Sequence, residues 1–443
     1  MSGNTCTSPS WKGDSYENVN YNHRSIFHMR ERWFFCLYLN CLIFYAKKTD
    51  MWIKDILNNI KGFRFNRHEF AGALGDMGTF IPILVGMVTV CGLNAGSALF
   101  FSGLFNLISG FIFGIPIAVQ PMKAIGTIAI NEGLTLNQIL AAGIVTSAVV
   151  FMLGVTNLIV FLNRHIPLSV VRGLQLGLGL LLIINGIKMI TNTNTIFGFD
   201  SIAVGAFCGL LVLFLFFSKK FPGALVIFAI GFIFLFLRTP DILKGFSYEL
   251  SIPEFTALSA DDFISGTFRA AIPQIPLTTL NSVIAVCALS WDLFPKKGAD
   301  VRKVSTSVGL MNLIGCWFGA MPMCHGAGGL AGQYRFGART GGSIAILGII
   351  KMIIGFFFGA YAIKLLSVYP LSVLGVLLTF SGMELAMTSR NIKTRSDMFV
   401  MLLTAAVIIA FHSTAIGFIV GLAIAYLFLY GIVRIEKLDE DTD

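Results

Sequence analysis

The sequence predicts an all-α polytopic membrane protein of about fourteen spans, built as a 7+7 inverted repeat. Three observations support this fold class. The composition is 56% hydrophobic and 12% charged with a mean hydropathy of +0.80, which is too apolar for a chain that must cover its surface with polar groups. Apolar segments follow one another with short breaks. A sequence repeat recurs in the two halves, at positions that give the halves opposite orientations.

The first fifty residues differ from the rest, because they are polar to about Glu31 and then carry only one short apolar segment. That segment, Trp33–Ala46, has about 14 residues, fewer than the roughly 20 needed to span a bilayer. It lacks a small-residue cleavage site. Residues 1–66 are therefore interpreted as an extension with a signal-like or interfacial segment, and the alternative is that translation starts at Met51.

Fourteen apolar segments follow the extension, and the third and tenth are too short to cross a bilayer alone. The segments are 69–89, 96–114, 120–131, 136–162, 168–188, 199–217, 222–238, 268–290, 304–320, 324–336, 342–366, 370–388, 397–411 and 413–433. We expect a first repeat over 67–240, an extracytoplasmic connection over 241–267, a second repeat over 268–433 and a short cytoplasmic tail over 434–443.

The loop charges agree with this count when both termini are cytoplasmic, because the basic residues then gather on the cytoplasmic side. The residues concerned are Arg164, Lys219, Lys220, Lys296, Lys297, Arg302, Lys303, Arg335, Arg339, Arg390, Lys393, Arg395, Arg434 and Lys437. Topology thus explains the net charge of +9 without a nucleic-acid partner. A multi-pass protein of the cell membrane is expected, with an internal membrane such as the vacuole left open for a eukaryotic source.

The internal repeat aligns "GLFNLISGFIFGIPI" (103–117) with "GLMNLIGCWFGAMPM" (309–323) at an offset of 206 residues, with six identities in fifteen positions. The copies fall on the second and ninth segments. Seven segments separate them, an odd number, so the two halves are inverted in the membrane. Inverted repeats are typical of secondary transporters.

Each copy ends in a proline, Pro116 or Pro322, and leads into one of the two short segments. A half-helix that starts inside the bilayer presents unpaired N–H groups and the positive end of its dipole. Irregular backbone at this depth is tolerated where it lines a cavity. The two short segments therefore predict an anion site near the membrane midplane.

Three motifs resemble the signatures of the molybdate transporter family, which is related to the SulP-type sulfate permeases. They are "EFAGALGDMGTFIPI" (69–83), "VQPMKAI" (119–125) and "PMCHGAGGLAGQYRFGARTGG" (322–342). The resemblance covers about Arg67 to Arg434. It implies a core domain of spans one to four and eight to eleven, and a gate domain of spans five to seven and twelve to fourteen. Sulfate permeases usually carry a soluble STAS domain after the last span, and its absence here is typical of the molybdate branch.

The resemblance also implies an oxyanion site between the starts of spans three and ten. Lys123 is the sharpest candidate, since a lysine at this depth needs an anion or a carboxylate, although it can also snorkel to an aqueous vestibule. The other substrate-binding candidates are Gln120, Pro121, His325, Gly326, Gly328, Asn281 and Ser282. Hydrogen bonding or close packing in the core remains the alternative for Gln120, His325 and the glycines.

Two acidic residues in the spans are candidates for ion coupling. Asp76 lies in the first span, where the repeat offset pairs it with Ser282, and it can carry a proton or neutralise Lys123. Glu384 lies in the twelfth span. Moving a dianion inward against 100 mV, negative inside, costs about 4.6 kcal/mol, at about 2.3 kcal/mol per charge. Uptake is therefore expected to be a proton symport or an anion exchange.

The predicted function is molybdate uptake by alternating access, with sulfate, tungstate or another anion as rival substrates and a passive anion channel as the rival class. The chain is not expected to be an enzyme, because no nucleophile and base converge in the sequence. No cofactor or metal site is predicted: the eight cysteines lack metal-binding spacing, and no phosphate-binding GxxxxGK[ST] loop occurs. A homodimer is left open.

Overall fold

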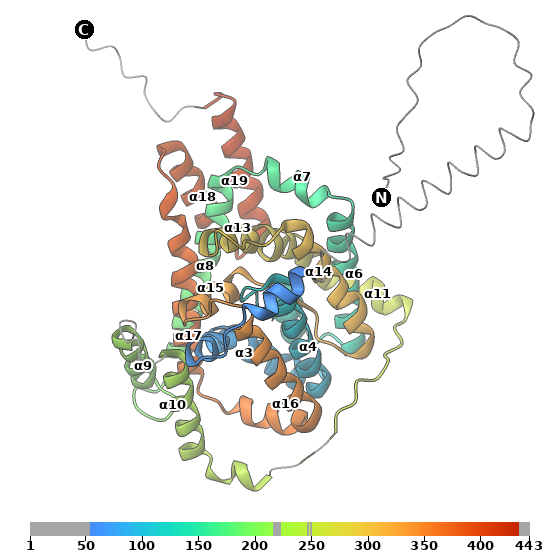
Figure 1. Cartoon of the computed structure of the whole chain (residues 1–443), viewed down its shortest axis with the longest axis vertical. Helices are drawn as coiled ribbons and strands as arrows, with labels where there is room; N and C mark the ends of the chain where they lie inside the picture. Colours follow the sequence, from blue (N-terminus) through green and yellow to red (C-terminus); the bar gives the residue numbers. More distant parts are fainter. Residues whose placement is uncertain (1–53, 216–222, 246–247, 249, 434–443) are drawn as a thin grey trace, which may run out of the picture. The chain divides into compact units, whose positions relative to one another are not determined.

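The computed structural model describes residues 54–215, 223–245, 248 and 250–433, and from Ile56 onward these belong to one compact unit. The predictions for residues 1–50 and for the tail at 434–443 lie outside the described residues. The fourteen predicted segments all have counterparts, in the expected order (Figure 1).

In the first half, the segments correspond to helices and to one short strand. They are α2 (Arg67–Ala73), η1 (Leu74–Asp76) and α3 (Met77–Cys91) as one span, α4 (Ala95–Phe113), β1 (Val119–Pro121) with α5 (Lys123–Glu132), α6 (Leu136–Val155), α8 (Leu168–Thr191), α9 (Ile202–Leu215) and α10 (Gly223–Arg238). A short helix, α7 (Leu158–His165), lies between α6 and α8, and η2 (Pro240–Gly245) follows α10.

The second half repeats this order. It consists of α11 (Ala260–Gly266), η3 (Thr267–Ala271), α12 (Ile272–Leu277), η4 (Thr278–Ala285) and α13 (Val286–Leu293) as one helical run, α14 (Val301–Gly315) with η5 (Cys316–Phe318), β2 (Met323–His325) with α15 (Ala327–Arg335), α16 (Gly342–Ser367), α17 (Leu371–Ala386) with η6 (Met387–Asn391), α18 (Arg395–Phe411) and α19 (Thr414–Leu429).

Two predicted boundaries were wrong. The segment 136–162 is not one span, because α6 ends at Val155 and Asn157 takes a left-handed conformation (φ 61°) that separates α7. The eighth span begins at Ala260 rather than at 268, since Ser259 and Asp262 form a capping box that starts the helix inside the predicted connection.

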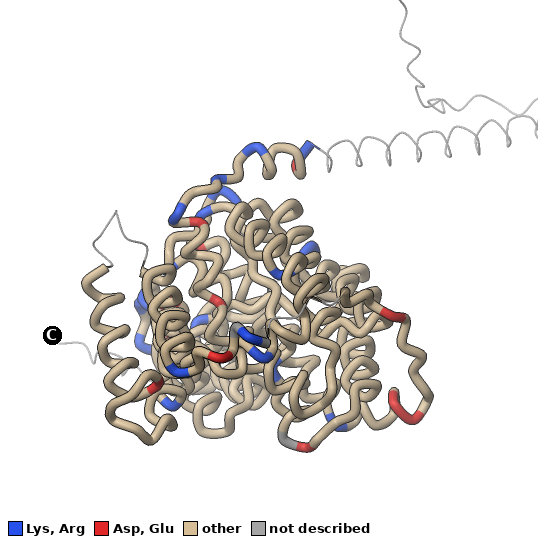
Figure 2. The backbone as a smooth tube through the Cα atoms, turned by 90° about the horizontal axis from the view of Figure 1, so that it is seen from below, with Lys and Arg blue, Asp and Glu red and all other residues tan. Residues whose placement is uncertain are grey.

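Seven helical runs within the described residues are long and apolar enough to cross a membrane, and α9, α10 and α19 are shorter apolar helices. Figure 2 shows that charged positions are few along the traced helices.

The helix packing has the symmetry of an inverted repeat. In the core domain, span two (α4) packs on span eleven (α16), and the equivalent pair, span nine (α14) and span four (α6), packs in the same way. In the gate domain, α8 packs on α17 and α18, and α17 packs on α9. The 7+7 arrangement predicted from the repeat is confirmed.

The α4–α16 contact depends on two glycines. A Cβ atom at Gly348 would lie 2.6 Å from the carbonyl oxygen of Gly103, and a side chain at Gly103 would overlap Gly348 in turn. Glycine lets the two backbones touch, which is how helices associate closely in a membrane.

Candidate functional site

The two short half-helices meet at their amino-terminal ends. The strands before them, β1 and β2, pair antiparallel with Val119 opposite His325 and Gln120 opposite Cys324. Helix α5 then starts at Lys123 and α15 at Ala327. The N-cap residues, Met122 and Gly326, make no side-chain capping bond to the first amides of their helices.

The matched asparagines of the repeat hold this strand pair in place. Asn106 on α4 accepts a hydrogen bond from the Val119 N–H at 3.0 Å. Asn312 on α14 accepts one from the Met323 N–H and donates one to the Met323 carbonyl, both at 2.6 Å. Each of the two aligned asparagines thus bonds the backbone just before its half-helix, 13 residues on for Asn106 and 11 residues on for Asn312.

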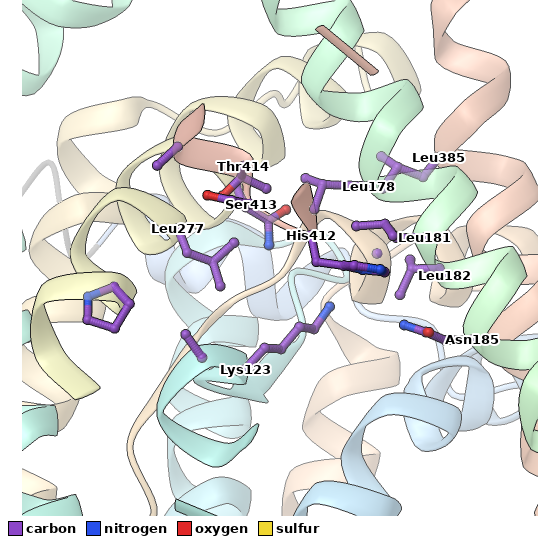
Figure 3. A pocket seen from close by; sticks show the side chains of 15 residues that line it. Lys123, Leu178, Leu181, Leu182, Asn185, Leu277, Leu385, His412, Ser413 and Thr414 are labelled. Carbon is purple, nitrogen blue, oxygen red and sulfur yellow. The ribbon is translucent and has the colours of Figure 1, made fainter. Parts of the chain in front are cut away.

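A cavity of about 340 Å³ opens at the ends of the half-helices, between core-domain and gate-domain residues (Figure 3). Its lining residues are Lys123, Ala124, Leu178, Leu181, Leu182, Asn185, Pro273, Leu277, Asn281, Gly328, Leu385, His412, Ser413, Thr414 and Ala415. No acidic residue is among these described lining residues. One lysine, polar donors and a helix end make the cavity suitable for a small anion.

The first amides of α5 are bonded by a side chain from span eight. The Gln274 Oε1 atom accepts hydrogen bonds from the N–H groups of Ala124 at 2.8 Å and Ile125 at 3.2 Å. Its amide nitrogen donates to Thr278 at 2.8 Å, and Gln274 is fully buried. A neutral oxygen therefore lies where the positive end of α5 attracts negative charge.

Asp76 and Gln120 form a buried pair behind the α15 end. The Gln120 amide nitrogen donates to one oxygen of the Asp76 carboxylate. The other Asp76 oxygen and the Gln120 oxygen are buried without a hydrogen-bond partner among the described residues. The Gln120 side chain lies against Gly326 and Gly329, where a Cβ atom would overlap it. These glycines are required because Gln120 fills the space that their side chains would need.

A buried lysine, Lys351 on α16, lies in the same region as Asp76. Its ammonium group is 3.1 Å from the Ser102 hydroxyl and 3.4 Å from the centre of the Phe80 ring, which is one helical turn beyond Asp76 on the same span. A cation of this depth is costly without such partners.

His325 is held by the protein rather than placed in the cavity. Its Nε2 atom is 3.1 Å from the Ser307 hydroxyl, and its Nδ1 atom is 3.4 Å from the Ala118 carbonyl. Its ring meets Phe113 edge to face at 5.5 Å and is fully buried. These contacts match the hydrogen-bonded core histidine that the sequence left open as the alternative.

Glu384 on α17 forms an ion pair with Arg335 at the end of α15, with 3.5 Å between Oε2 and Nη1. The pair links the core domain to the gate domain. Arg172 on α8 and Asp292 on α13 form a second link of this kind, with 2.8 Å between Nη2 and Oδ1. Glu384 is not among the residues that line the cavity.

The structure therefore brings together Lys123, Asn281 and Gly328 in one cavity. The other predicted site residues, Gln120, Pro121, His325, Gly326 and Ser282, lie in or around the strand pair and are buried. Sequence reasoning missed Gln274, Lys351 and the cavity residues Asn185 and His412. The sequence did mark Lys351 as a candidate, since it is a single charge deep in an apolar run. For the other three residues, the sequence showed nothing beyond a polar side chain.

A family model described as "Molybdate transporter of MFS superfamily" matches residues 68–182 and 266–385. The chain is 42% identical over 414 residues to "Molybdate transporter 2" of Arabidopsis thaliana, covering 84% of this chain and 88% of that protein. It is 38% identical over 399 residues to "Molybdate transporter 1" of the same plant, covering 81% and 87%. It is 32% identical over 465 residues to "Molybdate transporter 1" of Chlamydomonas reinhardtii, covering 80% and 90%.

Solved structures show the same fold at low sequence identity. The murine anion transporter Slc26a9 in its inward-facing state gives a TM-score of 0.55 at 16% identity, covering 87% of this chain and 73% of that chain. The transmembrane domain of the cyanobacterial bicarbonate transporter BicA gives 0.52 at 14% identity, covering 82% and 98%.

Proposed function

Because this chain belongs to the molybdate transporter family, we propose that it is a secondary transporter that carries molybdate into the cytoplasm by alternating access. The observation that supports this most strongly is the cavity at the half-helix ends, with Lys123 in its wall and no acidic residue among its described lining residues. The named relatives and the solved neighbours are transporters, which favours transport over catalysis.

The proposed substrate site has Lys123 and the start of α15, at Gly328, on the core side, with Asn281 beside them. A tetrahedral dianion there accepts charge-assisted hydrogen bonds from the lysine and from backbone N–H groups. Gln120, His325 and Pro121 in the strand pair, and Gly326 and Ser282 next to it, support these groups. The amides of α5 already bond Gln274, so Lys123 rather than these amides supplies most of the attraction on that side.

We propose that uptake is coupled to protons, since an uncoupled dianion would move against the membrane potential. Asp76 is the favoured proton carrier, because one of its oxygens is buried without a partner among the described residues. Glu384 is less favoured because it is paired with Arg335. Cytoplasmic termini and a location in the cell membrane belong to the same proposal.

Purified protein in liposomes tests the function directly. Labelled molybdate should accumulate under an inward proton gradient, and Lys123→Ala should raise the KM at least tenfold through loss of a charge-assisted bond. Lys364→Ala is the matched control, since Lys364 is exposed at the end of α16 and outside the cavity.

Competition and driving force separate the rival functions. If sulfate inhibits the uptake of labelled molybdate as strongly as unlabelled molybdate does, the assignment of molybdate as the substrate is wrong. Tungstate should compete, because its shape and charge are similar to those of molybdate. Uptake that equilibrates without any gradient of protons or counter-anions would identify a passive channel.

A further inference from the structure

His412 lies at the tip of the turn between α18 and α19, in a conformation that few residues adopt. Its φ of 49° and ψ of 29° are left-handed. Such a backbone is uncommon for a residue with a side chain, although histidine tolerates it better than most. Strained positions of this kind cluster at ligand-binding sites. The turn places the His412 side chain in the wall of the cavity.

The imidazole of His412 faces Lys123 across the cavity. Figure 3 shows the lysine ammonium and the histidine ring directed into the same space, with Asn185 beside them. In the described part of the chain, no hydrogen bond or ion pair involves this ring. By contrast, the rings of His165 and His325 both bond protein oxygens. The His412 ring is thus available to a ligand in the cavity.

The two groups come from different domains. Lys123 begins the half-helix α5 of the core domain, whereas α18 and α19 pack on each other and on α8 in the gate domain. A molecule that contacts both groups must lie between the domains. Gly328 at the start of α15 is in the same wall as Lys123, so the core contributes one side of the cavity and His412 contributes to the other.

We propose that His412 is the gate-domain ligand of the transported oxyanion. It donates an imidazole N–H to one oxygen while Lys123 and the start of α15 hold the opposite side. Neutral imidazole keeps one N–H, so this bond does not require a protonated ring. The inference rests on the proposed function and deepens it. It also means that the site is complete only where core and gate meet, so that anion binding depends on the position of the two domains.

Two substitutions at His412 separate the ligand role from the backbone. His412→Gly suits a left-handed backbone and removes only the ring, so the protein should fold. It should raise both the KM of molybdate uptake and the Kd of molybdate, measured by titration calorimetry on purified protein, at least tenfold. His412→Asn tolerates the same backbone and keeps an N–H donor, so it should fall between His412→Gly and the unchanged protein.

Phe411→Ala is the matched control, since Phe411 is exposed in the same turn but is not a lining residue of the cavity. Its KM and Kd should stay within twofold of the unchanged protein. Should His412→Gly bind and transport with unaltered constants, this inference is wrong while the transport function stands. Should the unchanged protein bind sulfate or tungstate instead, His412→Gly should raise the Kd of that anion at least tenfold, and an unaltered Kd would show that the inference is wrong. Should it bind none of the three, the proposed function and this inference fall together.

Discussion

Asp76 is a buried acid in the first span, and its environment explains why it is the favoured coupling group. One carboxylate oxygen takes the Gln120 amide, and the other has no hydrogen-bond partner among the described residues. Lys351 is a buried cation in the same region, with its ammonium group over the ring of Phe80, one helical turn beyond Asp76. Protonation of Asp76 therefore changes the charge of the buried Asp76–Gln120 pair, which lies next to the start of α15.

The first prediction concerns this proton. Asp76→Asn should abolish molybdate accumulation driven by a pH gradient, because the amide cannot take up and release a proton. Exchange of labelled for unlabelled molybdate across liposomes should persist, since it needs no net proton movement. Glu384→Gln is the comparison, and it should retain accumulation driven by the pH gradient. Normal accumulation by Asp76→Asn would remove Asp76 from the coupling mechanism.

Gln274 connects span eight to span three. Its side-chain oxygen accepts hydrogen bonds from two backbone N–H groups of α5, the first of them 150 residues away in the sequence. The second prediction is that Gln274→Leu lowers the thermal unfolding midpoint in detergent, since each buried N–H without a partner costs roughly 1–3 kcal/mol.

Gln274→Glu provides the matched comparison. It keeps an acceptor for the α5 amides, so stability should fall less than in Gln274→Leu. Its carboxylate places negative charge beside the cavity, so the KM for molybdate should rise. A Gln274→Leu protein with an unshifted midpoint would show that the capping bonds contribute little.

At the scale of elements, each half-helix depends on an asparagine from the preceding helix. Asn312 makes two bonds to Met323 and a third to Val308 at 2.9 Å, whereas Asn106 makes one to Val119. The repeat equates the two asparagines, yet their bonding differs. The second copy is thus anchored more firmly than the first.

The third prediction follows from this asymmetry. Asn312→Leu should lower the unfolding midpoint more than Asn106→Leu, because it removes the side-chain partner of both the N–H and the carbonyl of Met323, whereas Asn106→Leu removes that of the Val119 N–H alone. Parallel thermal melts of the two proteins in the same detergent measure the difference. The reverse order would mean that these bonds do not set the stability of the half-helix ends.

At the scale of the whole molecule, ion pairs join the two domains. Arg335 and Glu384 link α15 to α17, and Arg172 and Asp292 link α8 to α13. If alternating access moves one domain past the other, such links must break and form again during each cycle.

The fourth prediction tests this motion. Arg335→Cys with Glu384→Cys, bridged by a short bifunctional thiol reagent, should lose molybdate uptake and recover it when a cleavable bridge is reduced. Each single cysteine variant treated with the same reagent is the control. Undiminished uptake in the bridged protein would show that α15 and α17 do not move apart during transport.

How much of this molecule follows from sequence alone depends on the range of the interactions. The order of the spans, the two breaks and the inverted repeat were predicted correctly, because runs of about 20 apolar residues, prolines and matched asparagines are local signals. Lys123 and Gly328 were singled out from their place in the short segments and line one cavity, and their role as substrate ligands stays a prediction. The α6 and α11 boundaries were missed, since a left-handed Asn157 and a capping box at Ser259 interrupt or extend helices without changing hydropathy.

By itself, then, the sequence determined a membrane protein with two inverted halves, and it predicted an anion site at their paired half-helices. Only the tertiary structure decided which distant side chains lie around these half-helices: Gln274 on the α5 amides, Lys351 over the Phe80 ring, and His412 in the lining of the same cavity as Lys123. The physical reason is that these contacts depend on how whole helices rotate and pack against one another. That arrangement results from many weak contacts summed over the bundle, and no short stretch of sequence records it.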